Sequence, residues 1–161
     1  MAPEPSDRKP TAILFVCLGN ICRSAMAEGV FRNLAEKDGR DEGLVIDSAG
    51  TGSWHVGKPP DPRAIAKARE HGIDIAGQRG RQVASDDFQR FDLMLAMDRS
   101  NLETLLARAP AARHADIQLL MSHVTGRDAE VPDPYYGRPE GFEQVYRMIE
   151  AAGTALLDRL A

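Results

Sequence analysis

The chain has only two cysteines, Cys17 and Cys22, and they lie in one short segment. A secreted scaffold held by disulfides would carry more cysteines and spread them along the chain. Positive charge is also scarce, since 20 Lys and Arg against 24 Asp and Glu give a net charge of −4. No summed positive field is available to collect phosphates, so we expect no nucleic-acid partner, and any anion site must be local.

Long apolar runs are absent as well, since the longest spans about six residues, whereas a membrane-spanning helix needs roughly 20. The first ten residues hold three prolines and several charges, which is incompatible with the apolar core of a signal peptide. The length suits one hydrophobic core. We therefore expect a cytoplasmic protein with no membrane partner, consisting of a flexible N-terminal tail (residues 1–10) and a single domain (residues 11–161).

Metal ligands are sparse too. Cys17 and Cys22 lack the short pair spacing and the second ligand pair of zinc modules. The histidines are scattered along the chain, at His55, His71, His114 and His123. The sequence therefore predicts neither a metal nor a cofactor.

What the sequence does contain is an alternation of apolar runs and amphipathic segments. Runs rich in strand formers predict buried strands at residues 11–17, 44–46, 91–97 and 117–121. Helical spacing predicts helices capped by Ser24, by Asp61, by Asp98 or Ser100, and a last helix over 140–160, with a polar loop from about 122 to 138. The alternation predicts an α/β sandwich with parallel strands, which binds ligands beyond the carboxyl ends of its strands.

The segment from Cys17 to Ser24 lies at such an end, between the first strand and the first helix. None of its residues is proline, so each can offer a backbone N–H to an anion at the helix N-terminus. Gly19 adopts positive φ freely and Asn20 tolerates it, so the loop can curl into a concave nest. Arg23 adds a planar guanidinium that can hold two oxygens of a phosphoryl group.

The same surroundings favour the thiolate form of Cys17, which is the nucleophilic form, and Ser24 can donate a hydrogen bond to that sulfur. A nucleotide-binding P-loop would need a lysine where Arg23 stands. An ordinary strand-to-helix turn with a buried cysteine can show the same Cys-x5-Arg pattern. The strand end, the glycine, the lack of proline and the helix cap together favour a nucleophilic phosphate-binding loop.

A second candidate is Asp133, which has a proline on either side. A phosphate ester with a poor leaving group needs a proton as its bond breaks, and the two prolines would hold this carboxyl rigidly. An isolated Asp-Pro is more often only a turn. Tyr135 and Tyr136 follow it, and Trp54 lies on another loop; these aromatics could form the rim of a pocket for a flat substrate, although each alone is more often plain packing.

Taken together, these segments resemble the low-molecular-weight protein tyrosine phosphatases. The resemblance is carried by residues 16–24 and 133–136, and extends to residues 47–51, the loop of Trp54, and residues 61–63, 71–73 and 97–101. It implies a three-layer sandwich with a four-stranded parallel sheet of flavodoxin-like order 2-1-3-4 and helices on both faces. It also implies a monomeric, metal-independent hydrolase of phosphotyrosine proteins or small aryl phosphates.

The resemblance further implies a role for each site residue. Cys17 would attack phosphorus to give a phosphocysteine, Arg23 and the loop amides would hold the phosphate oxygens, and Asp133 would act as general acid and then as base. The phosphate-binding loop would comprise Leu18, Gly19, Asn20, Ile21, Cys22, Arg23 and Ser24. Asn20, Ser48 and His71 would support the loop through hydrogen bonds, although a histidine at a helix C-terminus such as His71 can also simply satisfy carbonyls.

Two regulatory possibilities accompany this assignment. A reversible Cys17–Cys22 disulfide would protect the nucleophile from over-oxidation. Phosphorylation of Tyr135 or Tyr136 would bring negative charge to the pocket rim.

Three other functions compete with this interpretation. Arsenate reductases share the fold but need further cysteines, and none follows Cys22. Protein-arginine phosphatases also share it and typically carry threonine where Ile21 stands, so Ile21 and the two tyrosines favour an aryl ester. A silent phosphoprotein-binding module would have lost the nucleophile, the arginine or the acid, and all three are present.

Overall fold

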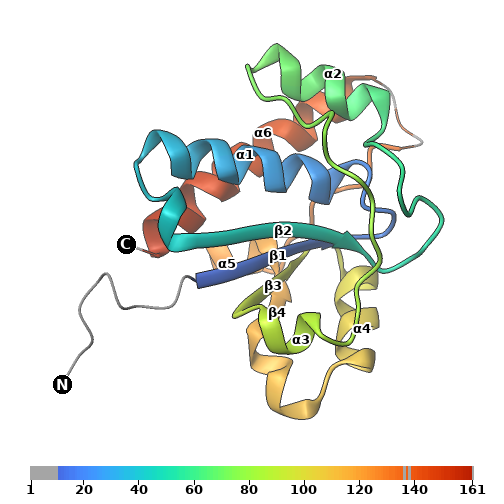
Figure 1. The fold of residues 1–161 in the computed structure, drawn as a ribbon, viewed down its shortest axis with the longest axis vertical. Coiled ribbons are helices and arrows are strands. Elements are labelled where there is room, and N and C mark those ends of the chain that lie inside the picture. The colour runs from blue at the N-terminus through green and yellow to red at the C-terminus, as the bar shows by residue number, and fades with distance from the viewer. Residues whose placement is uncertain (1–10, 136, 138, 161) are drawn as a thin grey trace.

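The computed structural model describes residues 11–135, 137 and 139–160, so the predicted tail lies outside the described residues. Four parallel strands form one sheet in the order β2-β1-β3-β4, which confirms the predicted order (Figure 1). The strands are β1 (Thr11–Cys17), β2 (Leu44–Gly50), β3 (Leu93–Ala96) and β4 (Ile117–Leu119). None of the helices described has the length and apolar character that crossing a membrane requires.

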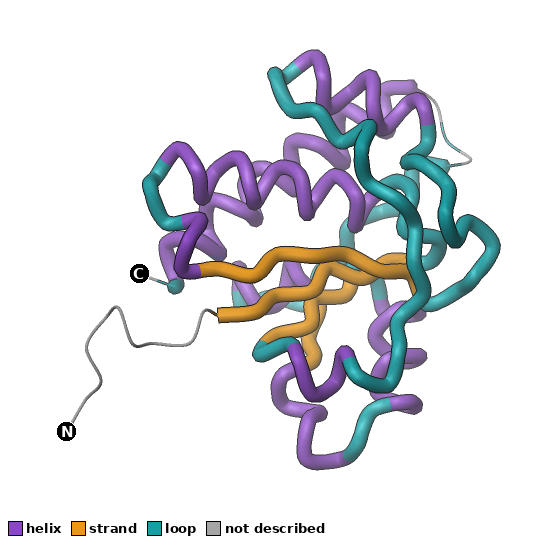
Figure 2. Tube along the Cα trace, viewed as in Figure 1, coloured by secondary structure: helices purple, strands orange, loops and turns teal. Residues whose placement is uncertain are grey.

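Helices cover both faces of the sheet, as the tube view also shows (Figure 2). One face carries α1 (Arg23–Lys37), α2 (Pro62–Glu70), α5 (Leu120–Thr125) and α6 (Pro139–Arg159). The other face carries α3 (Asp87–Arg90) and α4 (Arg99–Arg108). Short 3-10 turns precede β2 and β4, at Asp41–Gly43 and Ala111–Asp116.

The position of β1 inside the sheet explains why its sequence is apolar without interruption. Successive side chains of a strand point to opposite faces, so one set of β1 side chains packs under α1 and α6 and the other set under α3 and α4. The first set is Ile13, Phe15 and Cys17, and the second is Ala12, Leu14 and Val16. Because the first set ends at Cys17, the strand places this thiol on the α1 face at the carboxyl edge of the sheet.

Phe15 anchors the core beneath the site, and its removal tests this packing. It is 1% exposed, and its ring meets that of Phe31 edge-to-face with centroids 5.7 Å apart. Phe15→Ala should lower the free energy of unfolding by about 3–5 kcal/mol, because it leaves a cavity. Denaturant unfolding measures the loss. The control Val45→Ala, at a side chain 43% exposed on the neighbouring strand, should change stability by less than about 0.5 kcal/mol.

Two predicted helix starts are confirmed. Asp61 accepts a hydrogen bond from the Arg63 N–H at 2.8 Å and Pro62 is the first residue of α2. Asp98 forms a reciprocal capping box with Asn101 at the start of α4. The first helix begins one residue before the predicted cap, since Arg23 is already helical and Cys22 occupies the cap position.

The third and fourth strands are shorter than predicted. α3 ends at Arg90 and Phe91 caps it instead of opening β3, while the Asp92 carboxylate accepts the Ala12 N–H at 2.7 Å at the sheet margin. β4 ends at Leu119, and the predicted loop from 122 to 138 begins inside α5, which ends at Thr125 and is capped by Gly126 with a φ of 73°. Apolar periodicity alone does not distinguish a strand from an adjoining buried turn of helix.

Candidate active site

The loop between β1 and α1 has the tightly curled backbone that the sequence predicts. Asn20 has a φ of 59° and is the only non-glycine residue with positive φ in the described part of the chain. The loop presses on the last residue of β2, because a Cβ on Gly50 would lie 2.7 Å from the Leu18 carbonyl oxygen and 3.1 Å from the Asn20 nitrogen. Glycine at position 50 therefore permits the close approach of loop and strand.

The loop directs hydrogen-bond donors at the sulfur of Cys17. The backbone N–H of Asn20 points at Sγ from 3.3 Å, and the Ser24 hydroxyl lies 3.0 Å from it. Cys17 is 3% exposed and Ser24 is fully buried. Donors of this kind stabilise an anionic sulfur more than a neutral one.

Arg23 is held between the loop and two other segments. Its Nη1 donates to Asp98 Oδ2 at 2.7 Å and to the Val131 carbonyl at 3.0 Å, and its Nη2 lies 3.6 Å from Asp133 Oδ2. Burial works against the charge of Arg23, but negative charge at Cys17 and Asp98 outweighs burial and raises the pKa of Arg23. The guanidinium is therefore a fixed positive charge beside Cys17.

Asp98 has two functions that one pair of variants can separate. Asn is as good a helix cap as Asp, so Asp98→Asn should keep α4 intact but remove the charged partner of Arg23. We expect kcat/KM on an aryl phosphate to fall about tenfold, the loss of one charged hydrogen bond, with a smaller loss of melting temperature than in Asp98→Ala. Asp98→Ala should also destabilise the fold by about 1 kcal/mol. Equal kcat/KM for Asp98→Asn and the parent would contradict a role in orienting Arg23.

Asp133 reaches the same pocket from the segment that follows α5. The Val131 N–H donates to the Met97 carbonyl at 2.8 Å, which ties this segment to the end of β3. The Asp133 side chain is 39% exposed, and its Oδ1 accepts the Tyr135 N–H at 3.0 Å. The carboxylate thus stands at the pocket mouth with its second oxygen toward Arg23.

These residues enclose one cavity of about 390 Å³. Its lining comprises Cys17, Leu18, Gly19, Ile21, Cys22, Arg23, Trp54, His55, Asp133 and Tyr135. The structure therefore brings the predicted acid, Asp133, next to the predicted nucleophile and the predicted phosphate-binding arginine, from which it is more than 100 residues away in sequence.

The pocket rim is partly as predicted. Trp54 is 66% exposed, and the Tyr135 ring is covered on one side by the Arg63 guanidinium, 5.2 Å from its centroid. The prediction for Tyr136 lies outside the described residues. Sequence reasoning missed His55, whose ring packs so closely on the loop that a Cβ on Gly19 would lie 2.9 Å from its Cδ2. Its position next to Trp54 was the available signal.

Asn20 and Ser48, two of the three residues predicted to support the loop, are hydrogen-bonded to each other, but His71 lies elsewhere. Asn20 Nδ2 donates to Ser48 Oγ at 3.0 Å and to Ser24 Oγ at 2.9 Å. The structure corrects the prediction for His71, which follows the last residue of α2 and stacks on Tyr146 with ring centroids 3.9 Å apart. Its place beside Ser48 is taken by a carboxylate, Glu28, which accepts the Ser48 hydroxyl at 2.6 Å.

Among the described residues, one surface cluster brings together side chains of the kinds that bind metal ions: Glu70, His71 and Glu143. The Lys67 ammonium already pairs with both carboxylates at 2.8 Å. Mainly through Lys67, with Arg147 adding to it, these cations lower the pKa of Glu143 to about 2. The charges of this group are therefore balanced by the protein itself.

Comparison with known proteins places this pocket in a family. Residues 12–161 match the model of the low molecular weight phosphotyrosine protein phosphatases. A relative from Streptomyces coelicolor, named low molecular weight protein-tyrosine-phosphatase, is 46% identical over 149 residues and covers 90% of each chain. The crystal structure of YfkJ from Bacillus subtilis superposes with a TM-score of 0.89 at 40% identity, covering 96% of each chain. The chain belongs to the low-molecular-weight protein tyrosine phosphatase family and is a hydrolase of that kind.

A more distant structure is also similar. It is the YwlE arginine phosphatase in a variant with a phosphorylated active-site serine, with a TM-score of 0.86 at 27% identity, covering 93% of this chain and 95% of that one.

Proposed function

We propose that this phosphatase hydrolyses phosphotyrosine through a phosphocysteine intermediate, with Cys17 as nucleophile, Arg23 and the loop amides as phosphate ligands and Asp133 as general acid and base. The observation that carries the proposal is the sulfur of Cys17, which receives the Asn20 N–H and lies against the Ser24 hydroxyl in a pocket shared with Arg23 and Asp133. All the parts of an in-line phosphoryl transfer face one cavity.

In the first step the thiolate of Cys17 attacks phosphorus and an S–P bond forms as the P–O bond to the phenol breaks. Asp133, entering as the carboxylic acid, gives its proton to the departing oxygen, so that a neutral phenol leaves. Arg23 and the backbone N–H groups of the loop hold the phosphoryl oxygens, whose charge they neutralise in the transition state.

In the second step a water molecule attacks the phosphocysteine. Asp133, now a carboxylate, takes a proton from that water, an O–P bond forms, and the S–P bond breaks to return the thiolate. Inorganic phosphate leaves and Asp133 is again protonated. The phosphorylated active-site serine of the YwlE variant supports a covalent intermediate at the active site of that protein.

The preference for phosphotyrosine over phosphoarginine rests on the pocket wall. Ile21 faces the cavity with 9% of its surface exposed, and Tyr135 and Trp54 line the mouth. An apolar and aromatic wall suits a phenyl ring and offers a guanidinium no carboxylate apart from Asp133 among the lining residues described.

Paired peptides test this preference. Phosphate release from a phosphotyrosine peptide should exceed release from the matched phosphoarginine peptide, measured as kcat/KM. The reverse order would assign the chain to the alternative, a protein-arginine phosphatase. A silent binding module would release phosphate from neither, and arsenate reduction would need a cysteine beyond Cys22.

Cys22 is the candidate partner of Cys17 in a protective disulfide. Burial, and to a lesser extent Asp61 and Cys17, raise the pKa of the Cys22 thiol, so it stays protonated while Cys17 is the reactive sulfur. Peroxide would oxidise Cys17 to the sulfenic acid, and condensation with the Cys22 thiol would form the S–S bond and release water.

The expected result is reversible inactivation by peroxide. The parent should regain activity with dithiothreitol, whereas Cys22→Ser should recover less because its Cys17 proceeds to irreversible oxidation states. Equal recovery of the two proteins would rule out the disulfide.

The monomeric state, the cytoplasmic location and phosphorylation of the rim tyrosines stay predictions from the sequence.

A further inference from the structure

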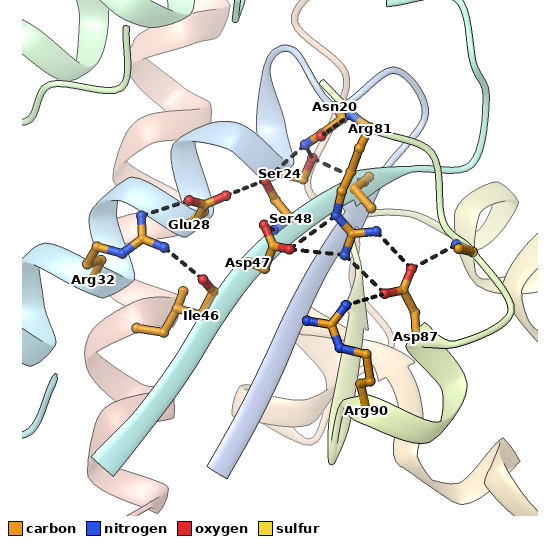
Figure 3. A network of polar contacts seen from close by, with 12 residues as sticks. Asn20, Ser24, Glu28, Arg32, Ile46, Asp47, Ser48, Arg81, Asp87 and Arg90 are labelled. Carbon is orange, nitrogen blue, oxygen red and sulfur yellow. Dashed lines mark hydrogen bonds and ion pairs between the residues drawn. The ribbon is translucent and has the colours of Figure 1, made fainter. Parts of the chain in front are cut away.

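A chain of polar contacts runs from Arg32 on α1 to Ser24 beside the candidate nucleophile (Figure 3). Arg32, whose side chain is 41% exposed, donates to Glu28 Oε2 at 2.7 Å. The other oxygen of Glu28 accepts the Ser48 hydroxyl at 2.6 Å. Asn20 then joins Ser48 to Ser24, and Ser24 lies 3.0 Å from Cys17 Sγ.

The direction of each hydrogen bond follows from its two ends. Glu28 is 7% exposed and pairs with Arg32, so it is a carboxylate that can only accept. Ser48 must therefore give its single hydrogen to Glu28. Its lone pairs are then left to accept from Asn20.

Asn20 donates a hydrogen bond to Ser24 as it does to Ser48. Its Oδ1 accepts the Arg81 N–H at 3.1 Å, which fixes the amide orientation with Nδ2 toward Ser48 and Ser24. Since Nδ2 donates to Ser24 Oγ, the Ser24 hydrogen is free to point elsewhere. The nearer acceptor is Cys17 Sγ at 3.0 Å, while the Ala49 carbonyl is 3.4 Å away.

We propose that Glu28 is a positioning residue of the active site: its carboxylate anchors Ser48 and, together with the Arg81 N–H on Asn20, holds the chain Ser48–Asn20–Ser24 in place so that the Ser24 hydroxyl donates to the Cys17 sulfur. Glu28 touches neither the pocket nor the sulfur, and it acts through three intervening side chains. The inference rests on the nucleophilic role proposed for Cys17, because the hydrogen bond donated by Ser24 matters only if Cys17 reacts as a thiolate.

Other charges stand near both ends of the chain. Arg32 is the ion-pair partner of Glu28, and the Asp47–Arg81 pair lies beside Ser48 on β2. The charged and titratable groups that share the pocket with Cys17 are Cys22, Arg23, His55, Asp133 and Tyr135. The test therefore leaves all of these in place except Arg32, which one variant removes on purpose.

Glu28→Gln is the sharpest single change. Arg32 can only donate, so the new amide would turn its oxygen to Arg32 and its NH₂ to Ser48. Ser48 would then accept from that NH₂ as well as from Asn20, and its own hydrogen would lose its acceptor. The Ser48 hydroxyl would no longer be anchored by a carboxylate, so Asn20 and Ser24 would be held less firmly although the shape of the side chains is kept.

The readout is the alkylation of Cys17 by iodoacetamide, followed by mass spectrometry that resolves it from Cys22. At pH 5.5 the alkylation rate depends on how strongly the site stabilises the thiolate of Cys17. At pH 9 the alkylation rate depends much less on that stabilisation. We expect Glu28→Gln to lower the ratio of the two rates about tenfold, as loss of a hydrogen bond to a charged group implies. Glu36→Gln, at an exposed carboxylate of the same helix, should leave the ratio unchanged.

Rescue separates orientation from simple damage to the fold. In Glu28→Gln/Arg32→Met the amide can again turn its oxygen to Ser48, so the ratio should return toward the parent value. If the double variant stays as low as Glu28→Gln, or if Glu28→Gln matches the parent, the proposal is overturned. Should Glu28→Gln not fold, Ser48→Ala must show the loss instead, and a parental ratio there overturns the proposal equally. Alkylation needs no substrate, so this outcome is distinct from a failure of the proposed phosphatase reaction.

Discussion

Replacing Cys17 by serine should abolish hydrolysis of para-nitrophenyl phosphate and of phosphotyrosine peptides, with kcat lowered at least about 10⁴-fold. The reason is the character of the groups around the sulfur. The Asn20 N–H points at the sulfur and Arg23 lines the same pocket; these groups can stabilise a thiolate, but neither can remove a proton. A serine hydroxyl at this position would remain protonated and weakly nucleophilic.

The same variant should still fold and bind inorganic phosphate, since the loop amides and Arg23 are untouched. Binding is measured by the rise in melting temperature with phosphate concentration. Cys22→Ser is the matched control, because it removes the other thiol of the same loop and should retain most of the parent's kcat. Parental turnover by Cys17→Ser, or a requirement of the parent for a divalent ion, would overturn the proposed mechanism.

The sequence was sufficient for the sheet because β1 is buried on both faces and reads as an unbroken apolar run. It was insufficient at β3 and β4, where Phe91 and Leu120 are as apolar as the strands that they adjoin. Phe91 and Leu120 lie outside the strands, yet each is only 1% exposed. Burial alone does not show whether a residue belongs to a strand, a helix or a turn.

The residues of the candidate site also differ in how far the sequence could predict them. Cys17, Arg23 and Asp133 were predictable because each sits in a local context with chemical meaning, a loop without proline before a helix or a carboxyl between prolines. His71 was misplaced and Glu28 was missed, because their partners are set by packing between α1, α2, α6 and β2. In the sequence Glu28 is simply one of the charged residues of an amphipathic helix, and only the structure shows it buried against Ser48.

The general acid can be tested through the leaving group. Asp133→Asn keeps the size of the side chain but cannot deliver a proton. General acid catalysis contributes typically about 10²–10⁴-fold, so kcat on phenyl phosphate or a phosphotyrosine peptide should fall by that factor. With para-nitrophenyl phosphate the departing oxygen needs less help from a proton, and the loss should be much smaller.

The contrast between the two substrates matters more than either loss alone. Asp133 lies 3.6 Å from Arg23, so a change of its charge also alters the electrostatics of phosphate binding, and that effect should fall on both substrates alike. A loss that grows as the leaving group becomes poorer is specific to proton transfer. If both rates fall by the same factor, Asp133 acts only through Arg23, and the acid must be sought elsewhere in the pocket, where His55 is the next candidate by position.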